Sequence, residues 1–438
     1  MRISRGVYLF SIGSNDYYAK ILLTKGFTIL NSFSESNHVG MVIGNLTTVI
    51  KEIYKTGGRK FAFMNVPDLG CLPVMRIMNT EKNGSCLEKA TSLAKLHNEA
   101  LSKQLFDLQK QLKGFKYSLF DLNSSLRKRI NHPFKYGFKE GKAACCGTGQ
   151  FRGVLSCGGK RPVKEFELCE NPNEYVYWDS IHLTEMANKQ LAREMWNGAR
   201  NSHVIGPYNL KKLFQIRYMR KQALNEKINI SNMTRLRLLV ICFLEIIFSC
   251  LLITGHTRSS PPLLEKHVAL FIFSDSLFDA GNNNYINTTT NFQANFLPYG
   301  ETFFKYPTGR FSDGRIIPDF IVCRFTIDSN IFAIHKPRIT HGVNFASSGA
   351  DALTETHQGL VIDLKTQLSN FKIVEEQLKK KPGNAAAKTL VSNAVYLIDG
   401  GGNDHFVALT TNSSVLQSLY SKKQYVDMVI GNLTTIIK

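Results

Sequence analysis

Several classes of protein are excluded by what this sequence lacks. It contains no Cys-x-x-Cys pair with histidines at zinc-binding spacing, although it has nine cysteines. The 54 lysines and arginines outnumber the 34 acids but are interleaved with them along the chain, so we expect no nucleic-acid partner. With 43% hydrophobic residues over 438 positions, the chain is expected to fold around a large core.

The cysteines indicate an oxidising compartment. Residues 145–169 are rich in glycine and cysteine, which favours a loop held by disulfides, with a metal-binding loop as the weaker alternative. Asn-x-Ser/Thr sites are compatible with the secretory route, so a secreted protein is expected. Six cysteines lie in the first half of the chain: Cys71, Cys86, Cys145, Cys146, Cys157 and Cys169.

A serine follows an apolar run in the second half. Val268 to Phe273 is uninterrupted by polar residues, which predicts a strand buried on both faces. Ser274, Asp275 and Ser276 follow at its carboxyl end, the edge where α/β sheets bind ligands. Ser276 is therefore a candidate nucleophile. The alternative is a Ser/Asp cap that opens the next helix.

A carboxylate and an imidazole lie close together in the first half. Asp179 and His182 are three residues apart, a spacing that predicts side chains on one side of a helical turn. A carboxylate beside an imidazole fixes its tautomer and supports its charged form, as a serine nucleophile requires of its base. The alternative is the start of a surface helix.

Strands and helices alternate along the first half, which favours a three-layer α/β/α sandwich with a parallel sheet. Asn15 follows the first strand in a glycine turn, where its amide can donate to an oxyanion or merely stabilise the turn. The expected strands are Val7 to Phe10, Phe61 to Val66 and Tyr117 to Asp121, and the expected helices are Val39 to Tyr54, Leu87 to Leu112 and Glu185 to Trp196.

Four short blocks together resemble the plant GDSL esterase/lipase family of the SGNH hydrolases. They are residues 274–284 around Ser276, residues 342–350 with Gly349, residues 13–16 with Asn15, and residues 178–182 with Asp179 and His182. The resemblance implies an α/β fold with a mostly parallel, five-stranded, flavodoxin-like sheet. It also implies a serine hydrolase that cleaves acyl esters, lipids among them, without metal or organic cofactor.

The resemblance also assigns roles to residues. Ser276 would attack the acyl carbonyl, His182 would carry the proton and Asp179 would orient His182. The backbone of Ser276 and Gly349 and the side chain of Asn15, or of Asn403 in a repeated block, would bind the oxyanion.

The blocks stand in an unexpected order. In the family the nucleophile lies near the amino terminus, whereas here Asp179 and His182 precede Ser276. Residues 1–207 are similar to a carboxyl-terminal half and residues 263–438 to an amino-terminal half. Residues 208–262 form a basic junction with an apolar stretch, Leu238 to Ile253, that resembles a signal peptide and is the place where membrane contact or anchoring would occur. Two neighbouring genes joined in one chain would give this order.

An internal repeat supports the joining of two halves. Residues 7–16 are echoed by residues 395–404, so both halves carry a copy of the family's third strand. We expect either one circularly permuted, five-stranded sheet with a surplus strand or two half-domains.

Two replacements put activity in doubt. Ser274 stands where the family has glycine, and Asp399 adds a charge beside the proposed oxyanion site, so Asn15 is favoured over Asn403. The alternative function is therefore a catalytically inactive, fused or membrane-tethered remnant that at most binds glycans or lipids.

Overall fold

The computed structural model describes residues 6–14, 16–17, 34–79, 83–159, 161–199, 204–216, 268–322, 339–351, 354, 356–400 and 403. Asn15 and the apolar stretch 238–253 lie outside these residues. Among the described residues, no helix is both long and apolar enough to cross a bilayer.

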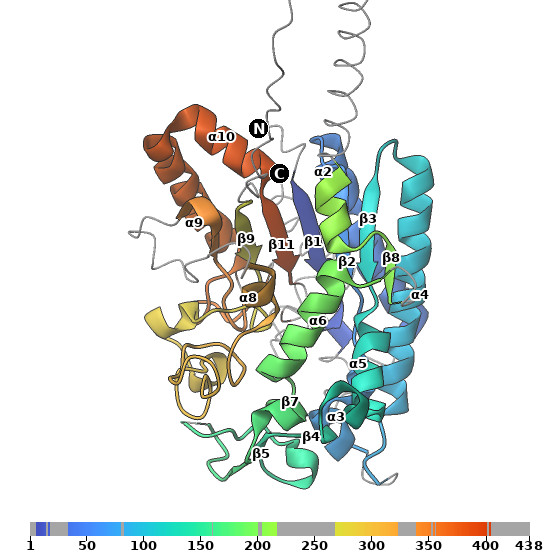
Figure 1. The fold of residues 1–438 in the computed structure, drawn as a ribbon, viewed down its shortest axis with the longest axis vertical. Helices are drawn as coiled ribbons and strands as arrows, with labels where there is room; N and C mark the ends of the chain where they lie inside the picture. Colours follow the sequence, from blue (N-terminus) through green and yellow to red (C-terminus); the bar gives the residue numbers. More distant parts are fainter. Residues whose placement is uncertain are drawn as a thin grey trace, which may run out of the picture.

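One sheet of seven strands organises the molecule (Figure 1). Neighbouring strands are parallel, except that the edge strand β8 is antiparallel to β3. In spatial order the strands are β10 (Gly342–Asn344), β9 (Leu270–Phe273), β11 (Val395–Asp399), β1 (Val7–Ser11), β2 (Lys60–Met64), β3 (Lys116–Phe120) and β8 (Ile205–Pro207).

The sheet is covered on both faces. Every residue of β1, β9 and β11 is buried. Since successive side chains of a strand point to opposite faces, strands buried at all positions must be covered from both sides. In Figure 1, α4 flanks the β3 side of the sheet, and α9 and α10 flank the β9 side. The α-helices among the described residues are α2 (Glu35–Lys55), α3 (Pro73–Ile77), α4 (Glu88–Gln111), α5 (Leu122–Asn131), α6 (Glu185–Asn197), α8 (Ile317–Val322), α9 (Leu364–Leu378) and α10 (Asn384–Asn393).

The α/β class and the mostly parallel sheet are confirmed, but the expected number of strands is wrong. Within the part of the chain that the structure describes, the sheet has seven strands, because both copies of the repeated strand enter it and β8 adds an antiparallel edge. The copies, β1 and β11, lie side by side, with Val7 opposite Val395 and Ser11 opposite Asp399. The surplus strand is thus at the centre of the sheet and not at its margin.

A second, smaller core lies below the carboxyl edge of the sheet. The strands β4 (Glu140–Ala144) and β7 (Tyr175–Tyr177) pair there, as do β5 (Cys146–Gly147) and β6 (Glu167–Leu168). Disulfides join Cys145 to Cys169 and Cys146 to Cys157, and a third joins Cys71 to Cys86. The expected disulfide-held loop is confirmed. Its cysteines pack with Trp178 and with aromatic residues of the second half.

The position of the surplus strand can be tested by truncating one leucine in each copy. Leu9 in β1 and Leu397 in β11 are register partners, and each is 1% exposed. Leu9→Ala and Leu397→Ala should each lower the free energy of unfolding by about 2–5 kcal/mol, because each leaves a cavity in a packed core. Urea denaturation measures both values. If only one copy entered the sheet, the variant in the other copy would unfold at the midpoint of the parent chain.

Candidate active site

The turn after β9 presents Ser276 at the carboxyl edge of the sheet. Gln367 of α9 holds this turn from both sides of Ser274: its Oε1 accepts from the backbone N–H of Ser274 at 3.1 Å, and its Nε2 donates to the Ser274 carbonyl at 3.0 Å. Asp275 adds a further restraint, since its Oδ1 accepts from the backbone N–H of Leu277 at 2.9 Å. Ser276 therefore leaves a fixed turn, as the strand-end position predicted.

Asp179 and His182 are in contact, although not on a helix. Both lie in an irregular loop after β7, and the expected helical turn is wrong. The loop is closed by Asp179 itself, whose Oδ1 accepts from the backbone N–H of Ile181 at 2.9 Å and of His182 at 2.8 Å. The Nδ1 of His182 lies 3.0 Å from both Asp179 oxygens.

The carboxyl of Asp179 is fully buried and remains ionised. Burial alone would raise its pKa, but the imidazole of His182 and the backbone donors outweigh burial and hold the pKa well below its usual range. An ionised carboxylate at Nδ1 keeps a proton on that nitrogen, which leaves Nε2 of His182 as the acceptor.

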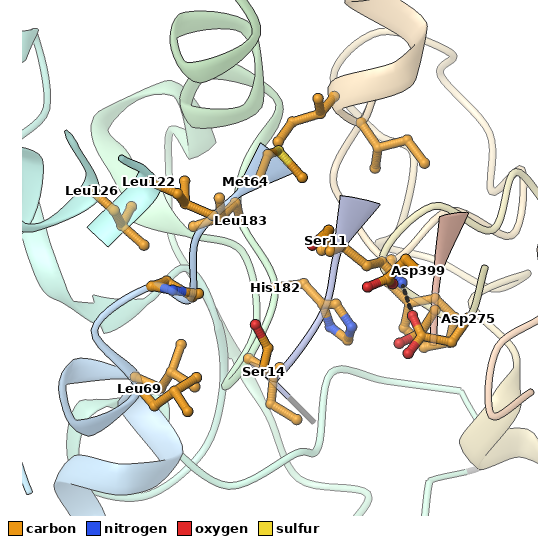
Figure 2. Close-up of a pocket in the computed structure, with 18 of the residues that line it drawn as sticks. Ser11, Ser14, Met64, Leu69, Leu122, Leu126, His182, Leu183, Asp275 and Asp399 are labelled. Atoms are coloured by element: carbon orange, nitrogen blue, oxygen red, sulfur yellow. Dashed lines mark hydrogen bonds between the residues drawn. The ribbon is translucent and has the colours of Figure 1, made fainter. Parts of the chain in front are cut away.

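Ser276 and His182 line the same pocket, which also has an extensive apolar wall. Figure 2 shows His182 with Leu69, Leu122 and Leu126 to one side and Asp275 and Asp399 to the other. The cavity volume is about 120 Å³. The structure thus brings together the predicted nucleophile and base, which are 94 positions apart in the sequence and come from different halves.

The strand β11 lies between the strand that carries Ser276 and β1. Within the described part of the chain, the Ser276 hydroxyl and the His182 imidazole share the pocket but form no hydrogen bond with each other. Inserting β11 between β9 and β1 separates the serine-bearing strand from β2 by one additional spacing of about 4.8 Å.

The predicted oxyanion donors are only partly assembled. The backbone N–H groups of Ser276 and Gly349 have no acceptor among the described residues, but Gly349 packs against Phe292 and does not line the pocket. The Nδ2 of Asn403 lies 2.9 Å from the carbonyl of Ala350 and 3.4 Å from Asp275. Both Asn403 hydrogens are thus engaged, so its oxyanion role stays a prediction that requires one of these bonds to be exchanged.

The two unusual residues near the nucleophile contact each other. The Ser274 hydroxyl donates to Asp399 Oδ2 at 3.0 Å. Burial, followed by the neighbouring charge of Asp275, raises the pKa of Asp399 well above its ordinary value, although the Ser274 bond acts in the opposite direction. Asp351 is buried nearby and adds to the increase. A proton on Asp399 removes the charge that would otherwise repel an oxyanion.

Sequence reasoning missed Tyr299, whose hydroxyl donates to Asp179 Oδ2 at 2.9 Å. Tyr299 belongs to the second half and is fully buried. It lies 120 positions from its partner, and no local pattern marks a tyrosine for such a contact. The described residues contain no cluster of side chains suited to a metal ion.

The fold and the site define a class of protein: an α/β protein with a serine after a buried parallel strand and an Asp–His pair whose histidine lines the same pocket. The chain belongs to the family described as GDSL-like Lipase/Acylhydrolase, whose model matches residues 3–195 and 270–436.

Individual relatives match about half of the chain. It is 59% identical over 217 residues to GDSL esterase/lipase 5 of Arabidopsis thaliana, an alignment that covers 49% of this chain and 55% of that protein. It is 43% identical to GDSL lipase of Tanacetum cinerariifolium, over 52% of this chain and 58% of that protein. Inactive GDSL esterase/lipase-like protein 25 of Arabidopsis thaliana is 38% identical over 48% of this chain and 47% of that protein. The chain thus spans about half the length of these relatives.

The buried Asp399 predicts a pH-dependent cost to stability. Below the unfolded pKa of about 3.9, Asp399 is protonated in both states and carries no penalty. As the pH rises towards the higher folded pKa, the unfolded chain releases this proton more readily, so the folded state loses stability. Asp399→Asn keeps an acceptor for Ser274 and cannot ionise. Its gain in unfolding free energy over the parent should therefore increase as the pH rises from 4 to 8, because only the parent keeps a carboxyl that resists ionisation in the folded state. Urea denaturation across this range measures the difference, and a gain that does not vary with pH would contradict the prediction.

Proposed function

We propose that the chain is a serine ester hydrolase of the GDSL type, with Ser276 as nucleophile, His182 as general base and Asp179 as the residue that orients His182. The observation that carries this proposal is the shared pocket, which is lined by a serine from the second half and by a carboxylate-supported imidazole from the first half. Membership of the family supports it.

The proposed reaction follows from these positions. Nε2 of His182 takes the Ser276 proton as the Ser276 oxygen attacks the acyl carbon, and the imidazolium then returns the proton to the departing alcohol. A water molecule, deprotonated by His182 in the same way, cleaves the acyl-enzyme and restores the serine. The backbone N–H groups of Ser276 and Gly349 and the Asn15 amide, with Asn403 as the weaker candidate, are the proposed oxyanion donors.

The lining of the pocket favours a short acyl group. Its wall includes Met64, Leu69, Leu122 and Leu126, which can accept a hydrocarbon chain but no charge. A cavity of about 120 Å³ is smaller than the roughly 300 Å³ at which pockets for drug-sized ligands begin. We therefore propose short-chain acyl esters as substrates.

The unusual order of the sequence blocks suggests how the chain arose. We infer that residues 1–207 derive from the carboxyl-terminal part and residues 263–438 from the amino-terminal part of two neighbouring family members, joined through residues 208–262. The adjacent β1 and β11, two copies of one strand, support this origin. The three disulfides favour a secreted protein.

A second candidate function is that of an inactive remnant that binds glycans or lipids. Two observations favour it: Ser276 and His182 form no hydrogen bond within the described chain, and the surplus strand widens the sheet between their supports. The resemblance to a relative described as inactive agrees with this alternative.

A fluorophosphonate probe tests the nucleophile. Such probes label only an activated serine, so the parent chain should be labelled at Ser276, and Ser276→Ala should abolish labelling. His182→Ala should slow labelling by about 10²–10⁴-fold, because an unassisted hydroxyl is a weak nucleophile. Ser14 lines the same pocket, and Ser14→Ala is the matched control that should label at the parent rate. Labelling that survives in Ser276→Ala would refute the assignment.

A rearranged chain separates the two candidate functions. A chain made of residues 268–394 followed by residues 7–216 would keep β1 and omit β11. Its sheet would then contain one copy of the repeated strand and not two. Narrowing the sheet should bring Ser276 within hydrogen-bond reach of His182. Hydrolysis of p-nitrophenyl acetate should then be at least ten-fold faster than in the full chain, a gain of about 1.4 kcal/mol in transition-state stabilisation. A folded rearranged chain without hydrolysis would favour the inactive remnant.

A further inference from the structure

We propose that Tyr299 is a positioning residue for the Asp179–His182 pair and that Arg161 holds Tyr299 in place. The proposal rests on the proposed function, since it concerns the same pair. It adds that the second half contributes two groups to the site: the nucleophile, and the tyrosine on which the orientation of the base depends.

The hydrogen bonds of Asp179 divide between the two halves. Oδ1 accepts from two backbone N–H groups of its own loop, so it is held locally. Oδ2 accepts from the Tyr299 hydroxyl at 2.9 Å and otherwise faces only the His182 imidazole. Without Tyr299, one oxygen of a buried carboxylate would have a single donor, and the carboxylate could rotate about its local anchor.

The Tyr299 phenol can act only as a donor to this carboxylate. Burial, and next the negative charge of Asp179, raise the pKa of Tyr299 well above its ordinary value, so its hydroxyl keeps its proton. The rings of Trp178 and Phe296 pack edge-on against Tyr299, with centroids 5.8 and 5.4 Å away. These contacts fix the direction of the hydroxyl.

Arg161 ties the surroundings of Tyr299 to the disulfide-held loop. Its side chain is fully buried, and it donates to three carbonyls of the second half, those of Thr290, Asn291 and Gln293, at 2.9–3.1 Å. Its Nη2 also lies 3.5 Å from the Tyr299 hydroxyl. The Arg161 guanidinium, from the first half, thus fixes residues 290–293, the segment that leads to Tyr299. Tyr299 is thereby held close to Asp179.

The function of this arrangement is to keep the His182 ring in one orientation. The orientation of the imidazole depends on the carboxylate to which its Nδ1–H is bonded. If the carboxylate rotates, Nε2 of His182 no longer points at the serine hydroxyl and cannot accept its proton. Loss of the Tyr299 hydroxyl should therefore reduce turnover without removing any group that contacts the acyl chain.

Tyr299→Phe is the direct test, and Tyr396→Phe is the matched control. Tyr396 is also a buried tyrosine of the second half, but its hydroxyl donates to the Val391 carbonyl at 2.8 Å, away from the pair. In the full chain labelled with ¹⁵N-histidine, solvent exchange of the His182 Nδ1 proton should be at least ten-fold faster in Tyr299→Phe and unchanged in Tyr396→Phe. The His182 resonance is assigned by its absence in His182→Gln. Arg161→Lys keeps the positive charge but loses the several N–H donors of the guanidinium. Its exchange rate for the His182 Nδ1 proton should lie between those of the parent and of Tyr299→Phe.

Turnover provides the second measurement. With p-nitrophenyl acetate, Tyr299→Phe should lower kcat by about 10–100-fold, the effect of losing one hydrogen bond to a charged group, and change KM by less than about two-fold. Exchange unchanged in Tyr299→Phe would overturn the positioning role, whether or not the chain hydrolyses esters. Faster exchange in a chain that hydrolyses nothing would uphold the role and refute only the proposed function.

Discussion

A carboxylate can be buried only where donors replace the water that it loses, and this constraint governs the junction of the two halves. Asp179 has no exposure to solvent, and its own loop satisfies one of its oxygens. The other oxygen depends on Tyr299, which the second half contributes. The halves must therefore pack together for the Asp–His pair to exist in its observed form. Asp313 strengthens this junction by accepting from the first backbone N–H of α6 at 2.7 Å.

The pairing of strands in the sheet is less demanding than the burial of a carboxylate. Parallel strands are joined by backbone hydrogen bonds that require no particular side chain, provided that each strand is apolar on both faces. β1 and β11 meet this condition equally, so neither excludes the other. The packing of the core accommodates both strands, whereas the Ser276 hydroxyl and the His182 imidazole form no hydrogen bond among the described residues. Backbone pairing is less sensitive to an added strand than contacts between side chains from different elements are.

Local pattern predicted several elements, including the helices α2, α4 and α6, but not α9, α10 or β8. The apolar run before Ser276 became β9, and the three-residue spacing of Asp179 and His182 became a hydrogen bond, although through a loop rather than a helix. The repeat revealed the surplus strand. Its central position could not be predicted, because strand order depends on which edges meet in space and not on apolar pattern.

The long-range contacts were beyond sequence reasoning for a related reason. Tyr299 and Arg161 acquire their roles only when residues more than a hundred positions apart meet, and neither has a local signature. Ser274 and Asp399 each appeared to be damaging replacements, yet they bond to each other. A pair of departures can compensate where each alone would not, and only the three-dimensional contact shows it.

The buried guanidinium of Arg161 also bears on which halves can combine. Three of its hydrogen bonds end on backbone carbonyls, which every sequence possesses, so this part of the match depends on the path of the chain. The Tyr299 hydroxyl and the rings of Phe296 and Phe311 supply the side-chain part. A second half whose loop ran differently would leave a buried cation without acceptors, at a cost of about 3–5 kcal/mol. The three carbonyl acceptors of Arg161 therefore constrain the backbone path of residues 290–293 more than the identity of their side chains.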